Sequence, residues 1–266
     1  MGRHNLEYPK DALNKVKRHG ERGVYALERI HALVNASPLI HLSMTVPDSP
    51  FPVTLPMIGQ MGSFARPSAS LGDPLDLYVH GYVSGRMFNT ASSSSSSSSS
   101  GEGIPVCVSA AHVDGLVLSL SAFNSSYNYR SVVLFGHAAL VTDPEEKLYA
   151  LKLLTDGVVP GRWEGARLPP TQAELQSTSV LRVRVVSGSL KARDGETGDD
   201  KHDMEDERLR GEVWTGVVPV HQVFGEPVPS SYNRVKEPPA YITDYARETT
   251  KENGEYAVNA INAQKK

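Results

Sequence analysis

Two short clusters of basic and hydroxyl-bearing residues are the parts of this sequence best suited to chemistry. The first, His80-Gly81-Tyr82-Val83-Ser84-Gly85-Arg86, falls where a strand is expected to give way to a turn. The second, Tyr129-Arg130-Ser131, opens a very apolar stretch from Val132 to Phe135. Guanidinium, hydroxyl and backbone N–H groups can converge on a phosphate. Either cluster alone would pass for an ordinary loop or surface charge, but together they predict an anion site built from two strands.

A third candidate is Gly161-Arg162-Trp163, which is expected to lie in a loop after a helix. Arg162 could bond to a planar ligand and Trp163 could stack on it. The alternative is a glycine that ends the helix, with Trp163 packed in the core. The residues alone favour neither interpretation.

The histidines give a weaker signal than these clusters. His80 lies beside the predicted phosphate site, and the others considered are scattered without metal-ligand spacing, so no structural zinc is predicted: His41, His112, His137 and His221. The sequence contains no Gly-x-Ser-x-Gly, P-loop or Rossmann glycine motif. The single cysteine, Cys107, excludes an intramolecular disulfide. Its apolar neighbours predict a buried core thiol rather than a nucleophile.

Composition limits the classes of function that remain. With 27 basic and 30 acidic residues the formal charge is −3, which argues against a nonspecific nucleic-acid-binding protein. The 266 residues suffice for one large β-barrel domain or two small ones. The first residues are polar, and no stretch approaches the about 18 apolar residues of a membrane-spanning helix. We therefore expect a cytoplasmic protein with no membrane partner.

The elements that must position these clusters are mostly strands. A helical start is expected over Asp11–Asn35, broken into two pieces at Gly20 and Gly23. Asp114-Gly115 is a hairpin-turn signal, so the strands on either side of it are expected to be separate. The pattern predicts strands at Leu39–Val46, Phe51–Ile58, Leu75–Tyr82, Ile104–Ala111, Gly115–Ser121, Tyr129–Thr142, Val180–Leu190 and Trp214–Val220.

Helices and loops are expected around this strand-rich core. Asp143-Pro144 predicts the start of a helix, and Thr171 with Glu174 fits the capping box of a second one. Ser92–Ser100 reads as a flexible loop tip, and the charged segment Asp194–Arg210 as a mobile loop. The end of the chain is expected to be an irregular arm, or a helix near Ile242–Arg247.

These expectations define a fold class and a domain organisation. The class is mainly β with peripheral helices, an α+β protein built on a barrel. Residues 1–37 are expected to be a helical segment that packs on the barrel. The barrel domain is expected over 38–224, with flexible loops at 91–102 and 194–210, and residues 225–266 would form a C-terminal arm.

The order of these segments resembles the pyridoxamine 5′-phosphate oxidase-like flavin-nucleotide-binding proteins, in the branch that includes nitroimidazole-resistance proteins. The resemblance covers roughly Tyr8 to Val220. Its most specific parts are the His-Gly…Ser-x-Arg and Tyr-Arg-Ser-Val…Phe-Gly stretches, in that order. The segments that carry it are Pro52–Met57, Leu77–Gly81 with Ser84–Arg86, Asn128–Gly136, Pro144–Lys147, Pro160–Arg162 and Trp214–Pro219.

This resemblance implies an FMN-binding split β-barrel that works as a homodimer, with FMN at the subunit interface. It places Val53, Thr54, Leu55 and Pro56 along the isoalloxazine edge. It places His80, Ser84 and Arg86, together with Tyr129, Arg130, Ser131 and Val132, around the phosphate and ribityl chain. Arg162 and Trp163 would reach the flavin of the partner subunit.

The function implied is that of an FMN-dependent oxidoreductase that acts on a small molecule such as a nitroaromatic, another flavin or oxygen. The cofactor would perform the redox chemistry, so the sequence indicates no catalytic acid or base. Three alternatives stay open: a flavin carrier or sensor without turnover, a haem-binding split barrel, and an interaction-only protein that has lost its cofactor. True pyridoxamine-phosphate oxidase activity is not favoured, because the sequence shows no clear match to that enzyme's substrate-binding C-terminal segment. The sequence does not indicate the substrate or the electron donor.

Overall fold

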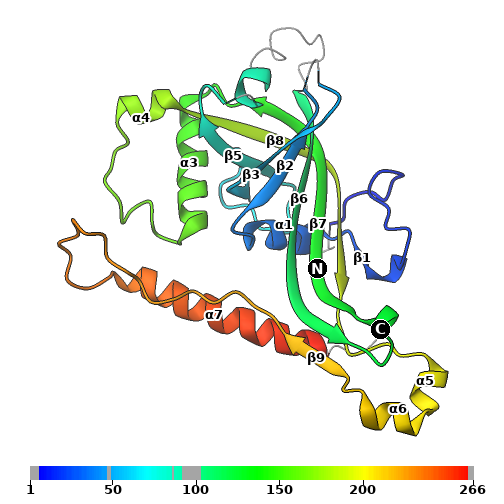
Figure 1. The fold of residues 1–266 in the computed structure, drawn as a ribbon. Helices are drawn as coiled ribbons and strands as arrows, with labels where there is room; N and C mark the ends of the chain where they lie inside the picture. The colour runs from blue at the N-terminus through cyan, green and yellow to red at the C-terminus, as the bar shows by residue number, and fades with distance from the viewer. Residues whose placement is uncertain (1–5, 47–48, 86, 92–102, 263–266) are drawn as a thin grey trace, which may run out of the picture. The chain divides into compact units, whose positions relative to one another are not determined.

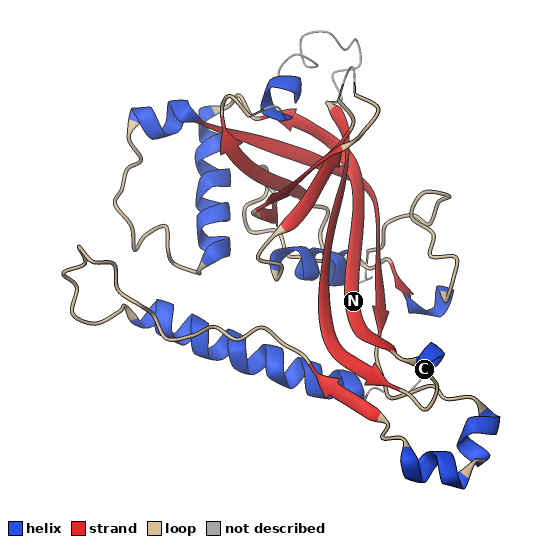
Figure 2. Ribbon diagram, in the orientation of Figure 1, coloured by secondary structure: helices blue, strands red, loops and turns tan. Residues whose placement is uncertain are grey.

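The computed structural model describes residues 6–46, 49–85, 87–91 and 103–262. These residues form a nine-stranded, mostly antiparallel sheet and several helices (Figure 2). This confirms the predicted fold class. The chain divides into two compact units: Met1–Ala110 with Ser131–Lys191, called unit 1 below, and Ala111–Arg130 with Ala192–Lys266, called unit 2.

Most of the sheet belongs to unit 1. The main path runs in the order β3-β2-β6-β7-β8-β5-β4, with β1 paired to β8. Side chains alternate along the strands, so that Val132, Leu134 and Ala138 point into the core. The strands are β1 Gly23–Val24, β2 Ile40–Met44, β3 Val53–Met57, β4 Gly59–Gly62, β5 Asp76–Tyr82, β6 Ile104–Leu118, β7 Ser126–Leu140 and β8 Thr178–Arg193.

The helical start is shorter than predicted. Only α1, Leu27–Asn35, forms an α-helix, preceded by the 3₁₀ turn η1, Gly20–Arg22, and by β1. The segment from Asp11 does not continue as a helix, because its polar groups bond elsewhere. The Asp11 carboxylate accepts from the backbone N–H groups of Leu13 and Asn14, at 2.8 and 3.0 Å. The Asn14 amide donates to the carbonyl of Gly188 in β8, which holds this segment against the sheet.

The two peripheral helices predicted from their caps are present. In α3, Pro144–Val158, the Asp143 side chain accepts from the Glu145 N–H, and Pro144 takes the first turn. In α4, Gln172–Ser177, Thr171 and Glu174 form the reciprocal capping box. The helix α3 packs beside β4 and β5, and α4 leads directly into β8 (Figure 1).

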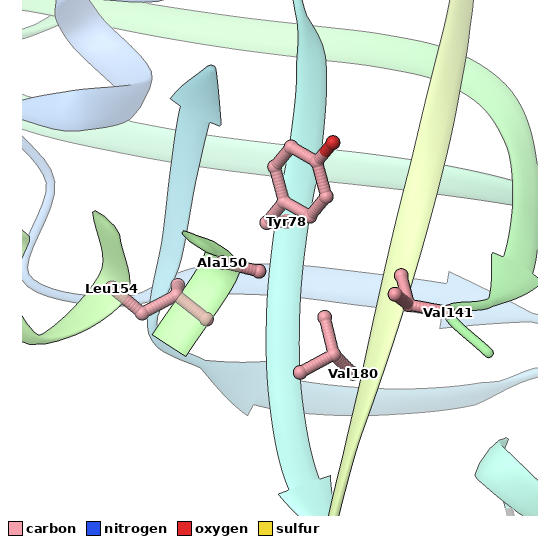
Figure 3. Close-up of a cluster of buried hydrophobic side chains, with 5 residues drawn as sticks. All are labelled: Tyr78, Val141, Ala150, Leu154 and Val180. Atoms are coloured by element: carbon pink, nitrogen blue, oxygen red, sulfur yellow. The ribbon is translucent and has the colours of Figure 1, made fainter. Parts of the chain in front are cut away.

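The helix α3 is held to the sheet by a small buried cluster. Figure 3 shows Ala150 and Leu154 of α3 near side chains from β5 and β8. The polar edge of the cluster is satisfied, because the Tyr78 hydroxyl donates to Glu146 Oε1 at 2.9 Å. Its buried members are Tyr78, Val141, Ala150, Leu154 and Val180.

The predicted hairpin at Asp114-Gly115 is wrong, because β6 continues through it as one 15-residue strand. Gly115 pairs with Pro219 of β9, Gly216–Pro219, and a side chain at this glycine would approach Val217 Cγ1 to 2.8 Å. The Asp114 carbonyl accepts from the Val220 N–H at 3.1 Å. The Asp-Gly pair therefore allows a close approach between strands rather than a turn.

Unit 2 contains the far ends of β6, β7 and β8, strand β9, short helices and the long C-terminal helix. The charged segment predicted as a mobile loop contains α5, Lys201–Glu205, and α6, Glu207–Glu212, and Asp206 caps α6. The C-terminal helix is far longer than predicted: α7 runs from Ala240 to Ile261 beside β9 (Figure 1). The remaining element is η2, Ala122–Asn124.

The serine run Ser92–Ser100, predicted as a flexible loop tip, lies outside the described residues. Among the helices of the described residues, none combines the length and apolar character needed to cross a membrane.

Candidate functional site

An apolar recess lies on the outer face of the sheet in unit 1. Ser43 of β2 stands directly opposite both Cys107 of β6 and Thr54 of β3. The Ser43 and Thr54 hydroxyls are 2.8 Å apart. The recess has a volume of about 280 Å³, and its walls include Ser43, Thr45, Pro52, Pro105, Cys107 and Phe135. This lining makes it an open, almost wholly apolar recess that suits a largely apolar group.

The cysteine does not lie where it was predicted. Cys107 is half-buried and faces this recess instead of the core. Burial raises the pKa of its thiol, which keeps the group protonated and unreactive near neutral pH. The thiol therefore remains inert, although it does not lie in the core. The alternation of side chains along β6 explains its position, because Val106 and Val108 point inward on either side of it.

The residues predicted along the isoalloxazine edge are not among those that line the recess, but they lie on the strand next to β2. Val53, Thr54, Leu55 and Pro56 form β3, the edge strand of the path, with Val53 half-buried and the others exposed. Pro52 lines the recess directly, and Thr54 is bonded to Ser43, which also lines it. Their contact with a flavin stays a prediction.

A second cavity, of about 370 Å³, brings His80 and Trp163 together within one chain. His80 comes from β5, Leu151 and Thr155 come from α3, Leu175 comes from α4, and Trp163 comes from the loop between the two helices. A hydrogen bond from the Trp163 N–H to Asp156 Oδ1, at 2.8 Å, holds that loop to α3. With Thr178 at the start of β8, the wall of the cavity is thus assembled from five separate segments.

His80 has an unusual environment in this cavity. Its Nδ1 atom is buried and has no hydrogen-bond partner among the described residues. Burial lowers the pKa of the imidazole, so the ring is neutral at neutral pH. A buried polar atom without a partner is uncommon in native proteins and calls for an explanation.

The rim of the cavity carries a balanced ion pair. Arg167 donates to both carboxylate oxygens of Glu174, each at 2.6 Å. The hydrogen bonds from Arg167 and from the Thr171 backbone lower the pKa of Glu174 to about 2. Arg162, the predicted anion-binding residue of this loop, is exposed and donates to the carbonyl of Gly165 at 3.2 Å. The charges of Arg167 and Glu174 at the cavity mouth therefore cancel.

The first predicted cluster is only partly gathered here. Ser84 is exposed in the turn after β5, and its carbonyl accepts from Asn89. Arg86 lies outside the described residues. Among the described members of this cluster, His80 is the one that lines the cavity.

The second predicted cluster is divided between the two units. Tyr129 and Arg130 belong to unit 2, and Arg130 is bonded through two nitrogens to Asp114. Ser131 and Val132 belong to unit 1, where the Ser131 hydroxyl donates to the Lys191 carbonyl and Val132 is buried in the core. Roles for these residues toward a phosphate stay predictions.

His137, considered from the sequence only as one of the scattered histidines, lies on the same face of β7 as Phe135. Its side chain is half-buried, and its Nδ1 atom is also buried without a partner among the described residues. The signal was present in the alternation of β7, which turns Phe135 and His137 to the side opposite Leu134 and Ala138.

Comparison with known proteins identifies the fold. The family model described as pyridoxamine 5′-phosphate oxidase matches residues 27–192, well over half of the chain. The chain belongs to this family. The predicted resemblance is confirmed, and the matched region holds the β2–β8 sheet, the recess and the His80 cavity. Comparison with curated protein sequences gave no match.

Two solved structures resemble this chain over most of its length. The flavocytochrome Anf3 from Azotobacter vinelandii is 29% identical with a TM-score of 0.71, covering 90% of this chain and 99% of its own. An FAD- and haem-binding protein from Mycobacterium smegmatis is 27% identical with a TM-score of 0.67, covering 85% of this chain and 97% of its own. Because residues 27–192 make up far less than 85% of the chain, both likenesses extend beyond the family region.

Proposed function

We propose that this chain binds a flavin and a haem, and that it transfers electrons through them to a small molecule. The observation that carries the proposal is the near-full-length likeness to a flavocytochrome and to an FAD- and haem-binding protein. The likeness includes chain beyond the family region, where a flavin-only relative need not match. The haem-binding barrel, an alternative to a flavoprotein on sequence alone, thereby becomes part of the same proposal.

The flavin ring is assigned to the recess on the outer sheet face. A flat apolar slot edged by hydroxyl and backbone groups suits an isoalloxazine ring, whose reactive edge needs hydrogen bonds but no charged partner. The residues that would hold it are those of β3, Val53–Met57, with Ser43, Cys107 and Phe135 beneath. In this role the protein orients the ring and excludes water, and the flavin supplies the redox chemistry.

The identity of the flavin is a separate point. The family resemblance implies FMN, whereas the near-full-length relative from Mycobacterium smegmatis binds FAD by its name. We favour FAD, because that likeness covers more of the chain than the family region does. Releasing the cofactor by denaturation and separating FAD from FMN by chromatography decides between them.

A homodimer is also part of the proposal. A ring bound on an open sheet face is shielded on one side only, and a second copy of the chain would cover the other. The exposed edge strand β3 and the half-buried residues around the recess support this arrangement. Light scattering coupled to size-exclusion chromatography, with and without flavin, measures the assembly directly.

The absorbance spectrum of the purified protein, supplied with flavin and haem, tests the cofactor content. We expect flavin bands together with a Soret band. A protein that takes up no flavin would overturn the flavin proposal, and a protein that takes up flavin but no haem would overturn the haem proposal.

Two matched variants test the recess itself. Cys107→Phe fills the slot and should abolish flavin uptake while haem uptake continues. Val113→Phe places the same side chain on an exposed position of the same strand and should change neither. Equal flavin affinity in both variants would remove the recess as the flavin site.

Electron transfer is tested by reducing the flavin anaerobically and following the haem spectrum. We expect haem reduction to follow flavin reduction, and turnover with NAD(P)H to require an added acceptor. If no acceptor supports turnover above that of free flavin, the chain is a carrier or sensor and the oxidoreductase part of the proposal fails.

A further inference from the structure

We propose that His80 is the residue through which this chain ligates the iron of haem, in the open cavity lined by β5, α3, α4 and the loop between the helices. This inference rests on the proposed function, since it assigns a site to the haem.

The imidazole of His80 is available to a ligand. Imidazole nitrogen is the commonest protein ligand to transition metals. The buried Nδ1 of His80 has no partner among the described residues, so the ring is not committed to a structural hydrogen bond. The ring also lines a cavity of about 370 Å³, within the range of small-molecule sites.

The cavity suits a flat macrocycle better than a flavin phosphate. Its walls are largely apolar, with Leu151, Leu175 and the Trp163 ring among them. A phosphate monoester carries roughly two negative charges and is usually held by cations. The cation at this rim, Arg167, is already paired with Glu174 through two short hydrogen bonds. The site therefore offers an imidazole and a largely apolar wall for the macrocycle, with Arg167 and Glu174 at its polar edge, where the propionates would lie.

Two other buried or half-buried histidines of unit 1 differ from His80. His31 is fully buried, but both of its nitrogens are engaged, with the Tyr8 hydroxyl at 2.8 Å and the Leu71 carbonyl at 2.7 Å. His137 shares the unpartnered Nδ1, yet it is not among the residues that line this cavity. Its side chain thus provides a matched control: the same chemistry without the cavity.

The experiment compares haem uptake by the full chain and by His80→Ala and His137→Ala, each titrated with haem. Wild type and His137→Ala should give the same Soret band and affinity, whereas His80→Ala should bind haem at least tenfold more weakly. Free imidazole should restore the band in His80→Ala. A wild-type spectrum in His80→Ala, or loss of haem only in His137→Ala, would overturn the assignment.

A second variant and a second readout cover failure to fold and failure of the wider proposal. His80→Met keeps a possible iron ligand, so its Soret and electron paramagnetic resonance spectra should shift rather than vanish. Flavin content should be unchanged in all three variants, and this unchanged content shows that they fold. If His80→Ala loses flavin but keeps haem, the cavity holds flavin and the assignment is wrong. If wild type itself takes up no haem, the haem part of the proposed function fails as well.

Discussion

The guanidinium of Arg130 donates two hydrogen bonds to the carboxylate of Asp114, at 2.9 Å from Nε and 2.7 Å from Nη2. The same guanidinium lies 3.6 Å from the centre of the Tyr256 ring of α7. Asp114 is almost fully buried, and Arg130 is largely so. Within unit 2 these contacts join β6, β7 and the C-terminal helix, so the charge that sequence analysis assigned to a phosphate already has a partner within the protein.

We predict that Arg130→Gln destabilises unit 2. The substitution leaves a buried carboxylate without its charged partner and removes the cation–π contact, so the free energy of unfolding should fall by about 2–3 kcal/mol. Arg247→Gln is the control, since it breaks an equally short but exposed pair with Asp244 on the same helix α7. Urea unfolding followed by circular dichroism measures both. Equal losses would show that the Asp114 pair contributes no more than a surface pair.

Gly136, the last residue of the Tyr-Arg-Ser-Val…Phe-Gly stretch, lies too close to β8 for any side chain. A Cβ atom at this position would lie 2.4 Å from the carbonyl oxygen of Arg184 and 2.9 Å from Val183 Cγ1. Backbone atoms cannot move aside as a flexible side chain can, so β7 and β8 would have to separate. Gly136→Ala should therefore lower stability by about 1–3 kcal/mol, the usual cost of overpacking. Gly198→Ala, where nothing lies within 4 Å, should leave the thermal midpoint nearly unchanged.

The elements predicted correctly are those set by local chemistry. The cap of α3 at Asp143 and the capping box of Thr171 with Glu174 involve residues within three positions of each other, so the sequence contains the whole signal. The predicted hairpin turn at Asp114-Gly115 was wrong for the opposite reason. Its behaviour depends on Pro219 and Arg130, which approach it only in the folded protein and hold it extended.

The candidate sites also combine a local sequence signal with contacts that form only in the folded protein. His80 stood out because of its neighbours in sequence, but its cavity needs α3, α4 and their connecting loop. Of these, α3 packs on β5 through Leu154 and Tyr78. The recess depends on the register that sets Ser43 opposite Cys107. A shift of one residue would turn Cys107 inward, and no local pattern fixes that register.

We predict a modest and local effect for Tyr78→Phe. The change removes the hydrogen bond to Glu146 but keeps the ring that packs against α3, and Glu146 still accepts from Arg182 at 3.0 Å. The loss should be about 1 kcal/mol, the typical net value of one hydrogen bond. Tyr127→Phe, at an exposed position, should cost nothing measurable in the same urea titration. A loss of several kcal/mol in Tyr78→Phe would mean that the Glu146 network depends on the hydroxyl far more than its geometry implies.

Stability should fall on acidification, and His31 should contribute to the fall. Burial lowers the pKa of His31 from its usual value near 6.5, opposed in part by the Leu71 carbonyl. The unfolded chain therefore binds a proton at this residue near pH 6.5 while the folded chain does not, so the free energy of unfolding decreases as pH drops below about 7. Burial shifts the pKa of His80 and of His112 in the same direction.

The variant that isolates this contribution is His31→Gln. It loses the bonds to Tyr8 and Leu71, so it should be less stable than wild type at pH 7.5. Its stability should nevertheless decline less steeply between pH 7.5 and pH 5.5, because one proton-binding group of the unfolded state is gone. His202→Gln, in which the replaced side chain is 80% exposed, should keep the wild-type slope. Urea unfolding at the two pH values gives both slopes, and a His31→Gln slope as steep as that of wild type would exclude His31 as a source of acid sensitivity.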